Sequence, residues 1–151
     1  MKNILVPIDF SNATPSVIKA GRVLAREHHA RIVLISVAPL PALAEVASMA
    51  AEDFVGSAEG PVAAKLAHYG DKLNAEGLET QPFERYGPPA ECIVEEARRI
   101  SADYIVMGSH GHTALYEALV GSITGWVLKH APCPVVVVPV LGFSPAFTSG
   151  R

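Results

Sequence analysis

The sequence predicts an α/β fold: a single doubly wound, Rossmann-like domain in which helices cover both faces of a five-stranded parallel sheet. Two observations carry this prediction. Short apolar runs without in/out alternation, typical of strands buried on both faces, alternate with segments of helical periodicity. The 151 residues, half of them hydrophobic and 18% charged, suffice for one globular domain with one core. Because parallel neighbours need crossover helices, the alternation favours a parallel sheet.

The first half of the chain supplies two strands and two helices. Residues 3–8 (NILVPI) form the first apolar run, and Pro15 begins a helix whose apolar residues recur at helical spacing as far as His28. The strand pattern returns at 31–37 (RIVLISV), and a second helix is predicted from Pro61 to near Gly77. Prolines and glycines interrupt residues 38–60, so the structure of that segment stays open, including a role as a lid over a ligand.

The second half supplies three strands and two helices. The strands are predicted at 78–86, 103–107 and 134–140, and the helices at 88–100 and 122–130. Pro82 lies within the first of these strands and therefore places it at the edge of the sheet. The domain is thus expected to span 1–140, with a loose tail at 141–151 that has no helical or strand period.

The helix predicted at 88–100 shows the clearest division between an apolar and a charged face. Its inward positions are Ile93, Val94, Ala97 and Ile100. Its charged residues are predicted to face water, with Glu95 at pairing distance from Arg98 and Arg99; they are Glu91, Glu95, Glu96, Arg98 and Arg99.

Charge and cysteine content exclude several classes of protein. Twelve basic and fifteen acidic residues give a net charge of −3 with no basic block, so we expect no nucleic-acid partner. No signal-like segment and no apolar stretch near the ~20 residues of a membrane span is present, so we expect a cytoplasmic protein without membrane contact. Cys92 and Cys133 form no C-x-x-C pair and are predicted to be reduced, structural thiols.

A glycine-rich stretch, GSHGHTALYEALVGS, follows the strand at 103–107 and leads into the helix at 122–130. Ligands of open α/β sheets bind beyond the carboxyl ends of the strands, where the winding reverses. Gly108 and Gly111 would let the loop turn sharply with its amides outward, while Gly121 and Ser122 lie at a helix N-terminus, which suits phosphate. Ser122 and Thr124 could add hydroxyl donors. The stretch therefore predicts a phosphate-bearing ligand.

Two common phosphate motifs are missing from the sequence. No Gly-Lys dipeptide occurs, and no two glycines are separated by a single residue. Neither the Walker-type motif nor the dinucleotide fingerprint can therefore be written anywhere in the chain.

The sequence resembles the universal stress protein family (UspA-like) and, within it, the branch that binds ATP. KNILVPIDFS is similar to the family's opening, ADYIVMGSHG to its fourth strand and loop, and VGSITGWVLKHAPCPVVVVP to its close. The signature of that branch, G-x2-G-x9-G-[ST], is complete at Gly108, Gly111, Gly121 and Ser122.

The resemblance implies an ATP site, also suited to AMP or ADP, with Mg²⁺ or Mn²⁺ held through the phosphates and not by protein side chains. The residues implied around base and ribose are Pro7, Ile8, Asp9 and Val37. Those implied around the phosphates are Gly108, His110, Gly111, Gly121, Ser122, Ile123 and Thr124. Met107 is implied as a further residue of the site. A homodimer through the last strand, Val135 to Val138, is implied as well. The chain departs from the family at His112, where a basic residue is usual, and at Phe10, where glycine is common and the loop is expected to be tighter against the ligand.

Several of these residues also have simpler interpretations. Asp9 could cap the turn before the first helix, Val37 could be core, and Ser122 could be an ordinary N-cap. His110, His112, His130 and Cys133 lack the compact spacing of a zinc site, so a metal site is not favoured. Tyr116 and Trp126 stay open between core positions and a cover over the loop.

The function we expect is that of an ATP-binding, nucleotide-responsive sensor or regulator in the stress response, with an unknown protein partner. No catalytic residue is assigned, and hydrolysis of ATP is expected to be weak at most, because no arginine lies near the glycine loop. The alternatives are a slow ATPase or phosphotransferase using His110 or His112, and an interaction module of the same fold without nucleotide. A flavin or redox carrier is a more distant alternative.

Overall fold

The computed structural model describes residues 1–39, 60–110 and 120–139. The predictions for Gly111, His112 and Tyr116, for the tail at 141–151 and for nearly all of 38–60 lie outside these residues. The elements are β1 (Asn3–Pro7), α1 (Thr14–His28), β2 (Arg31–Ala38), α4 (Pro61–Ala75), β3 (Thr80–Tyr86), α5 (Pro89–Arg99), β4 (Tyr104–Gly108), α6 (Ser122–His130) and β5 (Val135–Val138). All predicted strands and helices are present, and the ends differ from the predicted ones by a few residues.

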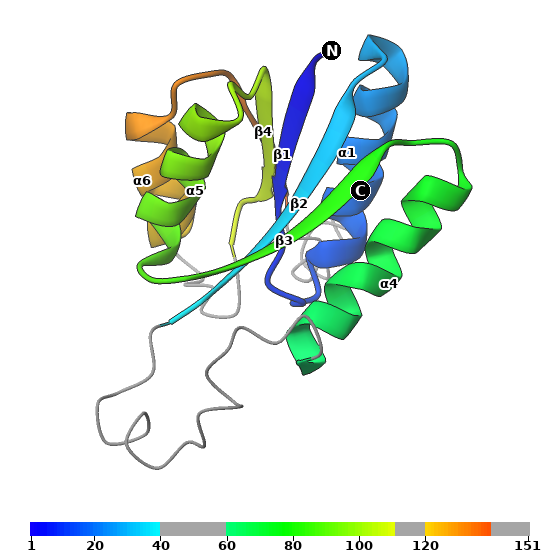
Figure 1. The fold of residues 1–151 in the computed structure, drawn as a ribbon. Coiled ribbons are helices and arrows are strands. Elements are labelled where there is room, and N and C mark those ends of the chain that lie inside the picture. The colour runs from blue at the N-terminus through cyan, green and yellow to red at the C-terminus, as the bar shows by residue number, and fades with distance from the viewer. Residues whose placement is uncertain (40–59, 111–119, 140–151) are drawn as a thin grey trace, which may run out of the picture.

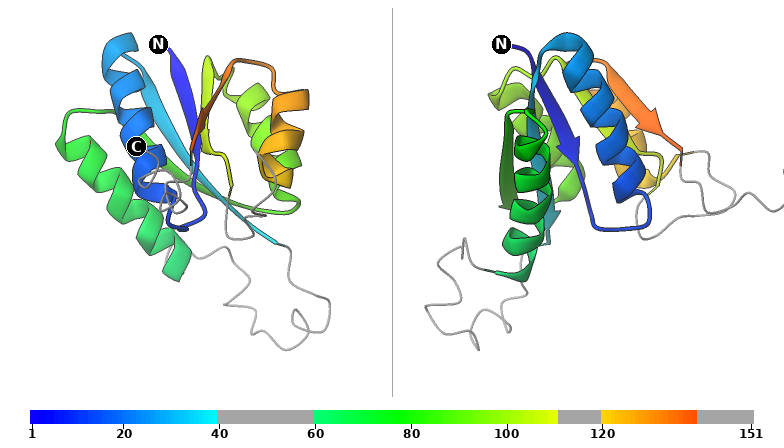
Figure 2. Two further views of the ribbon diagram at one scale, coloured as in Figure 1. Left: turned by 180° about the vertical axis from the view of Figure 1, so that it is seen from behind. Right: turned by 90° about the vertical axis from the view of Figure 1, so that its right-hand side faces the viewer.

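The predicted doubly wound sheet is confirmed. Five parallel strands follow the order β3-β2-β1-β4-β5, so the winding reverses between β1 and β4. Helices α1 and α4 cover one face of the sheet, and α5 and α6 cover the other (Figures 1 and 2). None of the described helices is long and apolar enough to cross a membrane.

The central strands are buried on both faces, which explains their continuous apolar sequence. In β1, Ile4 and Val6 belong to the core cluster under α1 and α4, whereas Leu5 belongs to the cluster under α5 and α6. All three side chains are at most 1% exposed. Successive residues of one strand thus pack into two different core clusters, one on each face of the sheet. All of these side chains are therefore apolar.

Strand β3 lies at a sheet edge, as Pro82 predicts. Pro82 is opposite Leu34 of β2, and its ring lies against Gly70 of α4, where an added Cβ would be 3.4 Å from the ring. A proline in this strand leaves no ladder hydrogen bond unmade, because the other side of the strand has no neighbour.

The prediction that every charged residue of α5 faces water is wrong at Glu96, whose side chain is 1% exposed. The carboxylate of Glu96 pairs with Arg99 on the same helix and lies 3.7 Å from the guanidinium of Arg85 in β3. Glu95 pairs with Arg85 at 2.9 Å and not with Arg98 or Arg99. Arg99 of the helix and Arg85 of the edge strand together supply the positive charge that lets a carboxylate be buried here.

Candidate functional site

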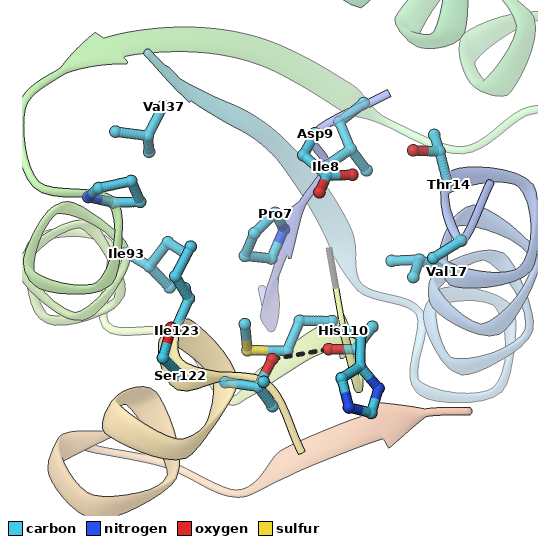
Figure 3. Close-up of a pocket in the computed structure, with 16 residues that line it drawn as sticks. Pro7, Ile8, Asp9, Thr14, Val17, Val37, Ile93, His110, Ser122 and Ile123 are labelled. Carbon is cyan, nitrogen blue, oxygen red and sulfur yellow. Dashed lines mark hydrogen bonds between the residues drawn. The ribbon is translucent and has the colours of Figure 1, made fainter. Parts of the chain in front are cut away.

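A pocket of about 230 Å³ lies at the carboxyl edge of the sheet, where the winding reverses between β1 and β4 (Figure 3). Eleven of the twelve residues implied by the resemblance line it, and the twelfth, Gly111, lies outside the described residues. The eleven are Pro7, Ile8, Asp9, Val37, Met107, Gly108, His110, Gly121, Ser122, Ile123 and Thr124. The fold therefore brings together residues from four separate parts of the sequence.

Five further lining residues were missed by sequence reasoning: Ala13, Thr14 and Val17 from the start of α1, and Pro89 and Ile93 from the start of α5. A signal for them was available. Both helices begin shortly after β1 and β3, whose carboxyl ends lie at the same edge of a parallel sheet. The first turns of these helices therefore border any ligand bound at that edge.

One wall of the pocket is apolar. It consists of half-buried Val37 at the end of β2, Pro89 and Ile93 of α5, and Met107 near the end of β4 (Figure 3). Val37 both packs against the core under α5 and lines the pocket, so its two interpretations hold together. This wall can accept a flat apolar group by contact and exclusion of water.

Asp9 lies at the mouth of the pocket, directly after β1, and is exposed. Its Oδ1 accepts a hydrogen bond of 3.0 Å from the backbone N–H of Ser11. The simpler interpretation, a carboxylate that caps the turn, is therefore confirmed, and the same side chain borders the pocket.

Phe10, which is expected to bring its loop closer to the ligand, is not itself among the residues that line the pocket. Its backbone is left-handed, with φ of 60°, which explains why glycine suits this position. The ring packs on Tyr69 of α4 with centroids 6.3 Å apart, and the ammonium of Lys65 lies 5.4 Å from its centroid. Phe10 thus anchors the loop on α4.

Gly108 has a different role from the predicted sharp turn. It is the last residue of β4, opposite Val138 of β5, and its φ lies outside the left-handed region. A Cβ at this position would lie 3.2 Å from the carbonyl oxygen of His110 and 3.3 Å from Cβ of Ala13. Glycine is needed here because strand, loop and α1 approach one another closely.

The N-terminus of α6 faces the pocket without a side-chain cap. Its N-cap is Gly121, with φ of −66° and ψ of 165°, so the interpretation of Ser122 as the N-cap is wrong. The first hydrogen bond of the helix runs from the N–H of Gly125 to the carbonyl of Gly121. The N–H groups of Ser122, Ile123 and Thr124 therefore have no partner within the helix.

Two of the predicted phosphate donors are engaged elsewhere. The N–H of Gly121 donates to the carbonyl of Ser109 at 2.7 Å. The hydroxyl of Thr124 donates to the carbonyl of Gly108 at 2.7 Å, the dashed line in Figure 3. Both bonds join the end of β4 to the start of α6. They position the three amides of the first helical turn relative to the pocket.

His110 is the one imidazole among the described lining residues. Its Nδ1 lies 3.1 Å from the hydroxyl of Ser109, a contact that orients the ring. The described lining residues include no arginine or lysine. The described ranges also hold no cluster of three or more His, Cys, Asp or Glu side chains that could bind a metal.

Neither cysteine belongs to the pocket as described, and both are free thiols. Burial, and to a lesser degree the carboxylate of Asp103, raise the pKa of the Cys133 thiol above its ordinary value. Trp126 is half-buried against the core under α5 and α6 and stacks on His130, with centroids 3.9 Å apart. This favours the core interpretation of Trp126.

Comparison with known proteins agrees with this fold. The model of the universal stress protein family matches residues 1–139. Universal stress protein MJ0531 of Methanocaldococcus jannaschii is 34% identical over 145 residues, which cover 91% of this chain and 81% of the relative.

Two solved structures extend the comparison. Universal stress protein UspA from Lactobacillus plantarum has 29% identity and a TM-score of 0.71, with 91% of this chain and 97% of that chain covered. A universal stress protein from Archaeoglobus fulgidus, solved in complex with dAMP, shares the fold at 21% identity, with a TM-score of 0.65 and 91% and 97% coverage. On the family match and the relatives together, the chain belongs to the universal stress protein family.

Proposed function

We propose that this chain binds an adenine nucleotide, which is ATP, ADP or AMP. We further propose that it acts as a nucleotide-responsive regulator in the stress response. The observation that carries the proposal is the uncapped start of α6. Three N–H groups without helical partners lie beside a pocket whose other wall is apolar. That combination suits a ligand with a flat base at one end and phosphate at the other.

The base would lie against the apolar wall and the phosphates on the first turn of α6. The cavity of about 230 Å³ is somewhat smaller than the roughly 300–1,000 Å³ of most ligand pockets. It therefore suits the nucleoside part, with the phosphates extending over the first turn of α6. The dAMP complex of the Archaeoglobus fulgidus protein supports a nucleotide of this kind in this fold.

A divalent ion, Mg²⁺ or Mn²⁺, would be bound by the phosphate oxygens. Asp9 is the one carboxylate among the described lining residues, and it already accepts a hydrogen bond from Ser11. Hard divalent cations of this kind commonly use phosphate oxygens and water with few protein ligands. The ion would reduce the charge repulsion within the bound triphosphate.

Regulation is a better proposal than rapid catalysis. With no arginine or lysine among the described lining residues, the charge of a phosphoryl-transfer transition state lacks a protein cation. The orientation of His110 by Ser109 is the observation that favours the enzyme alternative, a slow phosphotransferase. Phosphate release at the rate of a buffer blank would exclude that alternative, whereas release that is lost in His110→Ala would support it.

We also propose a cytoplasmic homodimer that pairs through β5. Strand β5 lies at one edge of the sheet. Among the described residues, no neighbouring strand pairs with its outer backbone N–H and C=O groups. Val136 on this strand is 36% exposed. A second copy could cover both features, and the free thiols of Cys92 and Cys133 suit a reducing compartment.

Calorimetric titration of nucleotide-stripped protein tests the proposed ligand. ATP with Mg²⁺, ADP and AMP are each titrated, with GTP as the control for the base. We expect at least one adenine nucleotide to bind and GTP to bind more weakly. Because the heat of binding can vanish at a single temperature, the titrations are run at several temperatures. No heat from any adenine nucleotide at all of them would contradict the proposal.

A further inference from the structure

The hydroxyl of Thr14 is buried without a hydrogen-bond partner. Thr14 is 2% exposed, and its Oγ1 has no partner in the part of the chain that the structure describes. The other buried atom of this kind, Nε of Arg22, lies 3.2 Å from a carboxylate oxygen of Glu76 and is compensated by that charge. Thr14 therefore stands out, because a buried hydroxyl without a hydrogen bond is unfavourable.

This hydroxyl belongs to the pocket. Thr14 is the first residue of α1 and lines the pocket between Ala13 and Val17. Figure 3 shows the side chain pointing from α1 toward the side of the pocket where Asp9 lies. The side chain of Thr14 thus borders the proposed ligand space, although its oxygen is closed off from solvent.

We propose that the hydroxyl of Thr14 forms a hydrogen bond with the sugar of the bound nucleotide; this rests on the proposed function. The apolar wall of Val37, Pro89 and Ile93 suits the base, and the first turn of α6 suits the phosphates. The sugar joins these two parts and has to lie between them. Asp9 and Thr14 supply the polar side chains of the wall that borders this middle space.

Rotation about one bond makes the contact possible. The oxygen of Thr14 is closed off from solvent, whereas the residue itself borders the pocket. A helical threonine populates two χ1 rotamers, so its hydroxyl and methyl groups can exchange places. The rotation would turn the oxygen toward the sugar and leave the methyl group in the enclosed space, which is the better place for an apolar group.

Two variants separate this role from a structural one. Thr14→Val replaces the hydroxyl with a methyl group of nearly the same shape, and Thr14→Ser keeps the hydroxyl. We expect Thr14→Val without ligand to melt at the wild-type temperature or above it, because it removes an unsatisfied polar atom. We expect it to bind ATP roughly three- to tenfold more weakly, and Thr14→Ser to bind within about twofold of the wild type.

Titrations of both proteins with 2′-deoxy-ATP and 3′-deoxy-ATP test the contact with the sugar. One of these analogues should bind the wild type more weakly than ATP does. The same analogue and ATP should bind Thr14→Val with equal affinity, because this variant lacks the threonine hydroxyl with which the missing sugar hydroxyl would have bonded. If neither analogue shows this coupling, the sugar contact is wrong.

The other outcomes distinguish this inference from the proposed function. Wild-type affinity in Thr14→Val overturns the inference alone, and so does a clear loss of stability without ligand, which would show that the hydroxyl has a structural partner. If the wild type binds no adenine nucleotide at all, the proposed function fails and the inference fails with it.

Discussion

Replacing Gly121 with alanine should weaken nucleotide binding and leave the fold intact. The backbone of Gly121, with φ of −66° and ψ of 165°, is open to any residue. An added Cβ would lie 3.4 Å from the carbonyl oxygen of Ser109 and 3.5 Å from Cα of His110, which are ordinary contacts. The folded protein therefore does not require glycine here, whereas a phosphate on the first turn of α6 would require close approach.

Two other glycines provide matched controls. Gly125 lies in the same helix, where an added Cβ would meet nothing within 4 Å, so Gly125→Ala should stabilise the protein by about 0.5–1 kcal/mol. At Gly108 the added Cβ would be 3.2 Å from a backbone oxygen, so Gly108→Ala should destabilise it by about 1–3 kcal/mol. Gly121→Ala should fall between them, within about 0.5 kcal/mol of the wild type.

Binding should follow a different order from stability. Loss of one hydrogen bond to a charged phosphate costs about 1.5–3 kcal/mol, so Gly121→Ala should weaken ATP binding roughly ten- to hundredfold. Gly125→Ala should bind ATP as the wild type does. Urea denaturation gives the stabilities and calorimetry gives the affinities. Wild-type affinity in Gly121→Ala would refute the reasoning, as would a loss of stability as large as that of Gly108→Ala.

Four further predictions concern the bond between α6 and β4, the buried carboxylate of α5, the thiol of Cys133 and the proposed dimer. Thr124→Val removes the 2.7 Å bond to the carbonyl of Gly108 and should cost about 1–2 kcal/mol in urea denaturation; an unchanged midpoint would contradict it. Glu96→Gln should cost about 1 kcal/mol, since it weakens the pairing with Arg85 and Arg99, and Glu95→Gln on the exposed face should cost less. Because its pKa is raised, Cys133 holds less thiolate at neutral pH than an ordinary cysteine, so in a Cys92→Ala background its alkylation by iodoacetamide should be slower than in the urea-unfolded chain and should speed up as the pH rises. Equal rates at neutral pH would count against it. Val136→Glu should shift the mass measured by light scattering from dimer toward monomer, and a wild-type monomer would show that β5 is not the interface.

The fold could be predicted from the sequence because its strongest signals are local. Each central strand serves two cores, as Leu5 and Val6 show, so its sequence is apolar throughout. The end of α4 was also marked locally: Gly77 follows the helix with φ of 83°, a conformation that favours glycine. Pro82 placed β3 at the edge through its missing N–H group.

What could not be predicted depends on contacts between distant parts of the chain. Besides Arg99 of its own helix, the buried Glu96 lies near Arg85, which belongs to another element and reaches it only in the folded sheet. The need for glycine at position 108 comes partly from Ala13, at the start of α1, which is distant in the sequence. The predicted site residues that the structure describes line one pocket, but the sequence could not show which donors are engaged, as the N–H of Gly121 and the hydroxyl of Thr124 are.

The most direct test of the account is an NMR titration of ¹⁵N-labelled protein with ATP and Mg²⁺, because it reports on each backbone amide separately. The account predicts that the largest shift changes include the N–H groups of Ser122, Ile123 and Thr124, with smaller changes at Val37 on the apolar wall. The N–H of Gly125, which is bonded within the helix, should move less. Unchanged amide shifts at millimolar ATP would contradict the claim that the start of α6 and the glycines before it, Gly108 and Gly121, hold a nucleotide. Changes confined to residues outside this pocket would contradict it as well.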